Sequence, residues 1–342
     1  MKSIILGPQA GRGALRPELV EMDVPVPGRG ELVVKMEACG LCGTDLEKMR
    51  GEYTASMPVL GHEAAGVISD VGDGVTAFRR GDRVFPHHHV PCYECYVCKA
   101  GDETMCDMYR KSNILPGGFS EYFRVPEWNV AKGGVLTLPN EVTFEEGALV
   151  EPAACCLRGI RKHAKAGETV LVAGAGPVGL MHALLLEPME VNVIISDISK
   201  PRLEFAERMN LGLVLDASKG DVPGRLKAET QGRGADLAIV ASGSKTAILQ
   251  ALGSIRKGGR VCLFGVPPKG SVLEYDISDL YNSGQQVVTS YGATDIDTKA
   301  ALGIIEANPD FARLVTHRFP LSKFDEAVAA SGGEAVKVVV TP

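Results

Sequence analysis

A glycine-rich loop that follows an apolar strand constrains the fold of this 342-residue chain more than any other feature. Thr169–Ala173 (TVLVA) predicts a buried strand, which runs into GAGPVG at 174–179 and then into a helical pattern. The first glycine of such a loop permits a tight turn, the second lets backbone approach a pyrophosphate, and the third lets helix and strand pack closely. The helix N-terminus then faces the phosphates. We therefore expect a dinucleotide site that includes Gly174, Gly176, Pro177, Val178 and Gly179.

The residues around this loop supply the context that a glycine-rich turn alone lacks. Apolar strands are predicted at 191–196, 237–241 and 260–264, with helical patterns at 179–187 and 202–209. Strands of this kind separated by helices indicate a parallel sheet that is covered on both faces. The second half of the chain is therefore predicted to be a doubly wound α/β unit.

Asp197 ends the next predicted strand, 23 residues after Gly174, close to the spacing expected for an acid that binds the adenosine ribose. Its carboxylate would bind the 2′-hydroxyl and repel a 2′-phosphate, which favours NAD over NADP. The alternative is that Asp197 only caps the following helix, because Asp-x-Ser-x-Pro suits a cap. Arg202 either lies along the adenosine or is a surface helix residue, and the sequence does not choose between them.

The first 150 residues have a different character. Short Val/Ile runs at 31–37, 65–69 and 82–85 are separated by Gly and Pro, which predicts an all-β, barrel-like unit. A chain of this length favours two domains. We expect the chain to return to the first unit near 287–291 and to end in a strand. The expected boundaries are 1–152 plus 290–342 for the first domain and 153–289 for the second.

Four cysteines are spaced C-x2-C-x2-C-x7-C within 15 residues, which is improbable for reduced surface cysteines. Such a set fills a tetrahedral zinc completely, so it stabilises a fold and leaves no position for a substrate. The triple histidine just before it, at 87–89, resembles a metal cluster. Adjacent side chains on a strand point to opposite faces, so we interpret these histidines as structural or pocket-rim residues. The predicted structural zinc ligands are Cys92, Cys95, Cys98 and Cys106.

A second group of potential ligands is scattered and mixed in type: Cys42, His62, Glu63 and Glu151. Thiolate, imidazole and carboxylate together are typical of a catalytic zinc that keeps one position open. A His beside a Glu is more often an ion pair, and Cys39 forms a C-x2-C with Cys42. No second unclaimed C-x2-C and no thioredoxin-like context accompany that pair, which disfavours a redox or zinc-knuckle interpretation.

The bulk composition excludes several functions. A net charge of −6 and a pI of about 5.7 give no reason to expect nucleic-acid binding. No apolar run approaches the roughly 20 residues that span a bilayer, and the N-terminal apolar stretch is too short for a secretory signal. Thiolate zinc sites need a reducing compartment, so we expect a cytoplasmic protein.

The motifs occur in the order seen in the zinc-containing medium-chain dehydrogenases, and the similarity extends over essentially the whole chain. They are CGLCGTD at 39–45, VLGHEAAGVI at 59–68, the four-cysteine lobe, GGFSEY at 117–122, EGALVEP at 146–152 and GAGPVG. Within that superfamily the chain most resembles the sorbitol (polyol) dehydrogenase branch, through VTFEEGALVEP at 142–152, SDISKPR at 196–202 and LVTHRFPL at 314–321. The resemblance implies a GroES-like β-barrel catalytic domain with an inserted Rossmann domain, and homodimers or homotetramers.

The resemblance also implies roles for individual residues. Cys42, His62 and Glu63 match the catalytic zinc ligands, Glu151 matches an acid that holds or approaches the metal through water, and Thr44 matches the hydroxyl that binds the alcohol and starts the proton path. Val266 and Ser290 join the cofactor-binding set. Two positions depart from the pattern. Glu47 stands where the family usually has histidine, so proton export would run through Glu47, ribose hydroxyls or water. Ser290 stands where the polyol branch typically has an arginine that contacts substrate.

The leading hypothesis is a dehydrogenase with one catalytic and one structural zinc per chain and NAD as hydride acceptor. Zinc lowers the pKa of a bound water from 15.7 to about 7, and an alcohol is activated in the same way. The substrate would be a polyol, sugar or related secondary alcohol that yields a ketone. A threonine-type amino-alcohol dehydrogenase and a simple alcohol dehydrogenase remain alternatives, as does a non-catalytic NAD-binding protein. The sequence does not identify the alcohol.

Overall fold

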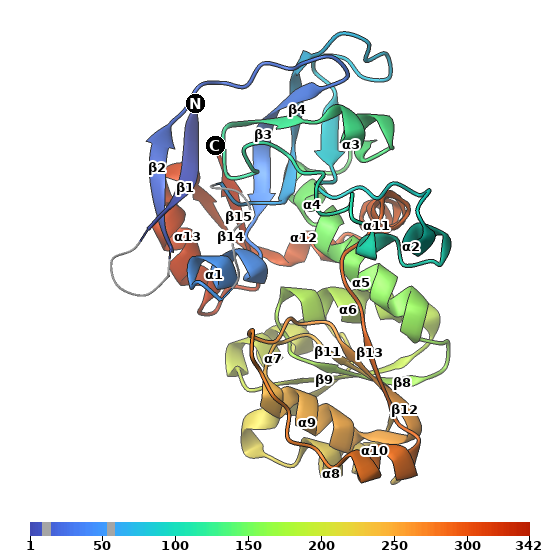
Figure 1. Cartoon of the computed structure of the whole chain (residues 1–342). Coiled ribbons are helices and arrows are strands. Elements are labelled where there is room, and N and C mark those ends of the chain that lie inside the picture. Colours follow the sequence, from blue (N-terminus) through green and yellow to red (C-terminus); the bar gives the residue numbers. More distant parts are fainter. Residues whose placement is uncertain (9–14, 53–58) are drawn as a thin grey trace. The chain divides into compact units, whose positions relative to one another are not determined.

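The computed structural model describes residues 1–8, 15–52 and 59–342. The chain divides into two compact units, Met1–Ala154 with Gly292–Pro342, and Cys155–Tyr291. Each unit is built on a sheet of its own, coloured largely blue to cyan and red in the first and green to orange in the second (Figure 1). Within the described residues, no helix is long and apolar enough to cross a membrane.

The first unit contains a seven-stranded sheet of order β14-β15-β3-β4-β5-β7, with β6 paired to β3, and a two-stranded sheet β1-β2. Its pairs are antiparallel except β14-β15. The strands are β1 Lys2–Pro8, β2 Leu15–Glu21, β3 Leu32–Gly40, β4 Glu63–Val71, β5 Arg83–Pro86, β6 Tyr122–Val125, β7 Val135–Thr137, β14 Val315–Pro320 and β15 Lys337–Thr341.

The central strand β3 brings together segments that are far apart in the sequence. Most of its side chains are buried, and β4, β6 and β15 all pair with it. Its register with β4 places Gly40 opposite Glu63, and its register with β15 places Gly40 opposite Val339. The residues that follow β3 therefore lie beside the start of β4 and the beginning of β15.

Several helices of this unit begin with capping boxes. In the box at α4, Thr143 Oγ1 accepts a hydrogen bond from Glu146 N at 3.2 Å, and Glu146 Oε2 accepts one from Thr143 N at 2.8 Å. Such reciprocal bonds satisfy amide groups that a helix start leaves unpaired. The helices are α1 Gly43–Met49, α2 Tyr96–Lys99, α3 Glu127–Ala131, α4 Phe144–Ala148, α11 Asp295–Ala307, α12 Asp310–Arg313 and α13 Phe324–Ser331, with 3-10 turns η1 Glu103–Met105 and η4 Leu321–Lys323.

The second unit is a six-stranded, wholly parallel sheet of order β10-β9-β8-β11-β12-β13. Every residue of β8 and β11 is buried, as expected for central strands covered on both faces. The doubly wound parallel sheet that the sequence predicts is thus confirmed. The strands are β8 Thr169–Ala173, β9 Asn192–Asp197, β10 Leu213–Asp216, β11 Ala235–Val240, β12 Ile255–Leu263 and β13 Gln286–Thr289.

Helices connect these strands, with α6 on one side of the sheet and α8, α9 and α10 on the other (Figure 1). The segment 287–291, where a return to the first unit was expected, begins with the last three residues of β13, and the second unit extends to Tyr291. The helices are α5 Val150–His163, α6 Pro177–Leu186, α7 Lys200–Arg208, α8 Val222–Glu229, α9 Lys245–Ser254 and α10 Ile277–Ser283, with 3-10 turns η2 Glu187–Met189 and η3 Ala217–Lys219.

Candidate active site

The pairing of β3 with β4 brings three of the predicted catalytic zinc ligands together. Cys42 lies just beyond β3 as the N-cap of α1, while His62 precedes β4 and Glu63 begins it. The ligand atoms of the three side chains lie within 4.8 Å of one another. Segments 20 residues apart in sequence thus form one group of thiol, imidazole and carboxylate.

Asp45 orients the imidazole of this group, a role that the sequence analysis did not assign. Its carboxylate is fully buried, lies 3.5 Å from His62 Nδ1 and accepts a hydrogen bond from Cys42 N at 3.1 Å. With Nδ1 engaged, Nε2 is the nitrogen left for a metal, as in carboxylate–histidine–zinc arrangements. Burial alone would lower the pKa of His62, but Asp45 and Cys42 together raise it well above its usual value. The surroundings of this imidazole therefore stabilise positive charge.

Glu63 and Lys337 form a buried pair behind the same group. They are 1% and 2% exposed, and the Lys337 ammonium lies against Glu63 Oε2 and donates to Leu41 O at 3.2 Å. Burial lowers the pKa of Lys337, but the Glu63 carboxylate and the Cys42 thiol outweigh it and raise that pKa above its usual value. Glu63 Oε1 has no hydrogen-bond partner, and a buried acceptor of this kind is costly unless something satisfies it. A metal ion beside Cys42 and His62 would do so.

Lys337 is a second functional residue that the motifs did not indicate. The signal was present, because it is a single lysine inside the apolar run VKVVVT at 336–341. A charged residue at the buried start of a strand requires a partner. The sequence does not show that this partner is Glu63, because that contact depends on the pairing of β15 with β3.

The two residues predicted for proton transfer lie on α1. Thr44 Oγ1 donates to Cys42 Sγ at 3.2 Å, so its hydroxyl is beside the metal group. Glu47, one helical turn further, is half-buried, and its Oε2 is buried without a hydrogen-bond partner. Burial and the Glu52 carboxylate raise the pKa of Glu47, although Arg50 and Lys48 oppose them. Thr44 and Glu47 thus lie on the same helix as the Cys42 N-cap.

Glu151 lies next to His87 and His88, and the ligand atoms of these three residues lie within 4.8 Å of one another. Its charge also reaches the Cys42 group, because Glu151 contributes to the raised pKa of Lys337, which is paired with Glu63. The alternation of side chains expected for a strand does not extend to these histidines, because β5 ends at Pro86 and residue 88 lies in a bend. The adjacent side chains of His87 and His88 therefore both point toward Glu151, whereas on a regular strand only residues two apart would share a face.

Burial keeps these imidazoles neutral. It lowers the pKa of His87 to about 3 and that of His88 well below its usual value, with smaller contributions from neighbouring histidines. His89 differs because its Nδ1 donates to Ser112 O at 2.8 Å. His87 and His88 are thus in the protonation state that ligates metals.

The four-cysteine group has dimensions that suit a tetrahedral zinc. All four ligand atoms lie within 4.8 Å of one another, with Sγ–Sγ separations of 3.5 Å for Cys95–Cys98, 3.5 Å for Cys92–Cys106 and 3.9 Å for Cys92–Cys98. Zinc–sulfur bonds of about 2.3 Å at tetrahedral angles require sulfurs about 3.8 Å apart, whereas a disulfide requires about 2.05 Å. The amides of Glu94 and Cys95 point at Cys92 Sγ and lower the pKa of Cys92 to about 6. None of the nine cysteines, all of which the structure describes, forms a disulfide.

In the second unit, the glycine loop has the backbone shape that its sequence predicts. Gly174 follows β8 with φ of +117° and donates to Ser196 O at 2.7 Å. A Cβ on Gly179 would lie 1.8 Å from Gly174 O, so only glycine allows α6 to approach the strand this closely. A Cβ on Gly176 would meet only Arg202 Nη1, at 3.8 Å. The space beside Gly176 thus leaves room for a phosphate next to the loop.

Asp197 ends β9 and braces this loop. Its Oδ2 accepts a hydrogen bond from Ala175 N at 2.6 Å and its Oδ1 accepts one from Ser199 N at 2.8 Å. Ser199, rather than Asp197, is the N-cap of α7. A carboxylate has about four acceptor positions, so two remain for ribose hydroxyls.

The other predicted cofactor residues follow strands of the same parallel sheet. Arg202 is half-buried and its Nε has no hydrogen-bond partner. Val266 follows β12, and Ser290 follows β13 with a buried, unpartnered Oγ. Ligands of parallel α/β sheets bind outside the carboxyl ends of the strands, which is where these residues and the glycine loop lie.

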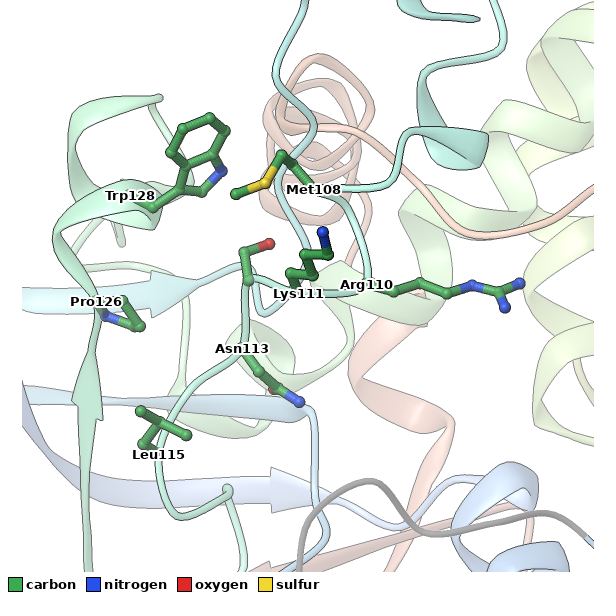
Figure 2. Close-up of a pocket in the computed structure, with 8 residues that line it drawn as sticks. Met108, Arg110, Lys111, Asn113, Leu115, Pro126 and Trp128 are labelled. Carbon is green, nitrogen blue, oxygen red and sulfur yellow. The ribbon is translucent and has the colours of Figure 1, made fainter.

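A surface pocket of about 340 Å³ lies elsewhere in the first unit. Figure 2 shows Trp128 and Met108 near each other, while Arg110 extends away from the other labelled side chains. None of the metal-group residues lines this pocket. Its lining is Met108, Arg110, Lys111, Ser112, Asn113, Leu115, Pro126 and Trp128.

Comparison with known proteins agrees with the two-unit architecture. Residues 28–140 match the alcohol dehydrogenase GroES-like domain, and residues 177–307 match the zinc-binding dehydrogenase family. Sorbitol dehydrogenase from Halalkalibacterium halodurans is 32% identical over 94% of each chain. This chain belongs to the zinc-containing medium-chain dehydrogenases. The predicted superfamily and fold class are thereby confirmed.

Other members of the superfamily differ in what they bind. L-threonine 3-dehydrogenase from Idiomarina loihiensis is 28% identical over 94% of this chain and 95% of its own. Among solved structures, a candidate zinc-binding dehydrogenase from Sinorhizobium meliloti 1021, bound to NADP, has a TM-score of 0.85 at 28% identity and covers 100% of this chain and 99% of its own. These relatives are all dehydrogenases, and the family model is that of zinc-binding dehydrogenases. The superfamily member described here is therefore an alcohol-type oxidoreductase that uses zinc and a nicotinamide cofactor.

Proposed function

We propose that this dehydrogenase oxidises a secondary alcohol of the polyol or sugar type to a ketone, with NAD as hydride acceptor. The observation that carries the proposal is the convergence of Cys42, His62 and Glu63, with Glu63 Oε1 buried and unpartnered. This donor set fits zinc and leaves a fourth position for substrate. When bound there, zinc supplies the Lewis acidity that makes an alcohol hydroxyl acidic near neutral pH.

The side chains around that position handle the proton. Thr44 Oγ1, which donates to Cys42 Sγ, is placed to accept a hydrogen bond from the substrate hydroxyl. Glu47 follows it by three residues on α1, which is the spacing of neighbours on one helical face. We assign proton release to Glu47, which replaces the histidine that the family usually has, because its half-buried carboxylate combines a raised pKa with partial access to water.

The second unit selects the cofactor. Asp197 is held by two backbone amides beside the glycine loop, and its negative charge favours ribose hydroxyls over a 2′-phosphate. We therefore propose NAD in preference to NADP. Replacing Asp197 with Ala should erode the NAD/NADP ratio of kcat/KM; an unchanged ratio would count against this role.

The substrate class is proposed from the sorbitol dehydrogenase relative. The L-threonine 3-dehydrogenase relatives support the second candidate, an amino-alcohol dehydrogenase, and Ser290 in place of the arginine of the polyol branch leaves room for it. NADH formation against a panel of polyols, sugars, L-threonine and simple alcohols separates them. Turnover of L-threonine alone would replace the first candidate by the second.

The decisive variant is Cys42→Ser, which removes the thiolate from the mixed group. We expect it to abolish turnover and to reduce the tightly bound zinc from two ions per chain to one. Cys155→Ser is the matched control, since Cys155 is half-buried and outside every metal group of the described residues. Full turnover by the Cys42 variant would refute the assignment.

We also propose that the protein works in a reducing compartment such as the cytoplasm and assembles as a homodimer or homotetramer. Four free thiols within one zinc lobe support the first point, because an oxidising compartment would pair them. The second follows from the family resemblance alone. Light scattering of the zinc-loaded protein measures the assembly, and a monomeric mass would contradict it.

A further inference from the structure

The chain passes between the two units at two points that differ in local structure. The first crossing, at Ala154–Cys155, falls inside the continuous helix α5. The second, at Tyr291–Gly292, falls in the loop between the end of β13 and the start of α11. Hinges are usually a few residues in loops or at the ends of elements, which absorb changes in φ and ψ. The chain therefore bends more easily at the second crossing than at the first.

Tyr109 holds the residues that follow this second crossing. Its hydroxyl donates to Ala293 O at 2.8 Å and accepts a hydrogen bond from Ala293 N at 3.0 Å. Tyr109 is 1% exposed and Ala293 is 0% exposed. Gly292 has a φ of +65°, and a Cβ at that position would lie 2.3 Å from the Tyr109 hydroxyl oxygen. One side chain thus satisfies both backbone groups of Ala293 and fits closely against the glycine before it.

The same side chain is joined to the four-cysteine lobe, residues 92–106. The backbone N of Tyr109 donates to Cys106 O at 3.0 Å, and Tyr109 packs in one buried cluster with Cys98 and Cys106. A second tie comes from Tyr93 inside the lobe, whose hydroxyl donates to the carboxylate of Asp295. The lobe therefore holds both the end of the crossing loop and the start of α11.

We propose that Tyr109 is a positioning residue that transmits the order of the four-cysteine lobe to the second crossing and limits bending there. Without its hydroxyl, the Ala293 amide and carbonyl lose their common partner, and the loop gains freedom beside Gly292. Hydride transfer requires an alcohol bound at the Cys42 group and a nicotinamide bound by the second unit to be held in a reactive geometry. This consequence for turnover rests on the proposed function, whereas the clamp itself does not.

Amide hydrogen exchange of the full-length, zinc-loaded Tyr109→Phe variant tests the clamp, because Phe keeps the ring and removes only the hydroxyl. We expect the Ala293 amide to exchange at least about fivefold faster, as loss of a buried hydrogen bond implies, with zinc content unchanged. The matched control is Tyr96→Phe, since Tyr96 lies in the same lobe and is 86% exposed. That control should exchange at the wild-type rate. An unchanged rate at Ala293 in the Tyr109 variant would overturn the proposal, and so would an equal rise throughout the first unit, which would indicate lower global stability alone.

The other side of the contact provides an independent variant. Gly292→Ala places a Cβ against the Tyr109 hydroxyl, so it should also accelerate exchange at Ala293. In the double variant with Tyr109→Phe, the effects on the logarithm of the rate should sum to less than the two single effects, because the hydroxyl that the Cβ meets is absent. Fully additive effects would refute direct coupling between the two positions.

Kinetics then separate positioning from a purely structural role. With an alcohol that the wild type oxidises, Tyr109→Phe should lower kcat by at least about threefold, because the reacting groups are held less firmly. The Kd for NADH should stay unchanged, since the proposed cofactor residues lie in the second unit. An unchanged kcat in a variant that exchanges faster at Ala293 would remove the positioning role. A wild type that oxidises no alcohol would contradict the proposed function, while the exchange rates would still decide whether the clamp exists.

Discussion

Replacing Asp45 with Asn tests whether the buried carboxylate behind His62 tunes the catalytic metal group. Asn has nearly the same volume and keeps an oxygen that can accept from Cys42 N, so the start of α1 should persist. It removes the negative charge that lies 3.5 Å from His62 Nδ1. The imidazole then becomes a weaker and less firmly oriented ligand.

The magnitude follows from the geometry. A full charge pair at 3.5 Å is worth about 5 kcal/mol at an effective dielectric constant of 20, which is an upper bound because a metal-bound imidazole is formally neutral. Loss of an outer-sphere partner typically reduces metal affinity by about 10–100-fold. That range equals about 1.4–2.8 kcal/mol and lies within the bound. We therefore expect zinc affinity at the Cys42 group to fall by one to two orders of magnitude.

Competition with a chromophoric chelator measures this affinity while the four-cysteine zinc stays in place. The matched control is Asp297→Asn, because Asp297 is also buried in the first unit and also belongs to a capping box, with Thr294. That variant should lose some stability and no zinc affinity. Equal zinc affinity in the wild type and the Asp45 variant, with both proteins folded, would refute the proposed role of Asp45.

Three further changes test other parts of the structure. Gly179→Ala places a Cβ 1.8 Å from Gly174 O, so the loop must shift and NADH affinity should fall at least tenfold with zinc content unchanged; NADH fluorescence titration checks this, and an unaltered Kd would contradict it. Lys337→Met leaves the Glu63 carboxylate buried without its cation, which should cost the metal-free protein about 3 kcal/mol, and zinc should restore part of the loss in urea unfolding. Asp236 accepts hydrogen bonds from Arg256 Nε at 2.6 Å and from Thr169 N at 2.8 Å. Burial raises the pKa of Asp236, but these two bonds outweigh burial and lower it below its usual value. The ionised carboxylate therefore stabilises the fold above the pKa of the unfolded chain, and this stabilisation is lost as the pH falls through the pKa of the folded protein. Asp236→Asn should therefore cost about 1–2 kcal/mol at pH 7, with Arg256 partly screened by solvent, and nothing near pH 2; a constant difference across that range would be inconsistent with the ion pair.

Local patterns were sufficient for much of the fold. Thr169–Ala173 forms the predicted strand, because a short apolar run before a glycine turn has few other ways to be buried. The four cysteines converge because only 13 residues separate the first from the last, so the chain can close around one ion without help from other elements. The identification of individual zinc ligands stays a prediction.

Long-range pairing accounts for what the sequence did not predict. Lys337 reaches Glu63 only because β15 pairs with β3 and β3 pairs with β4. The convergence of His87 and His88 on Glu151 depends on where β5 ends, and an argument based on strand alternation fails beyond Pro86. Element boundaries of this kind are set by tertiary contacts more than by local propensity.

The open metal group therefore depends on sheet register in a way that the cysteine lobe does not. Side chains alternate between faces along a strand, so slipping β4 by one residue against β3 would turn Glu63 away from Cys42 and Lys337. The resulting structure would bury an unpaired lysine and an unpaired carboxylate, each without a partner. The Glu63–Lys337 pair thus makes the wrong register unfavourable and also positions a metal ligand. We expect the Lys337→Met variant to fold into the zinc-binding form more slowly than its lower stability alone would predict. Refolding followed by zinc uptake in stopped flow measures this, and uptake that tracks stability alone would remove the register role from the pair.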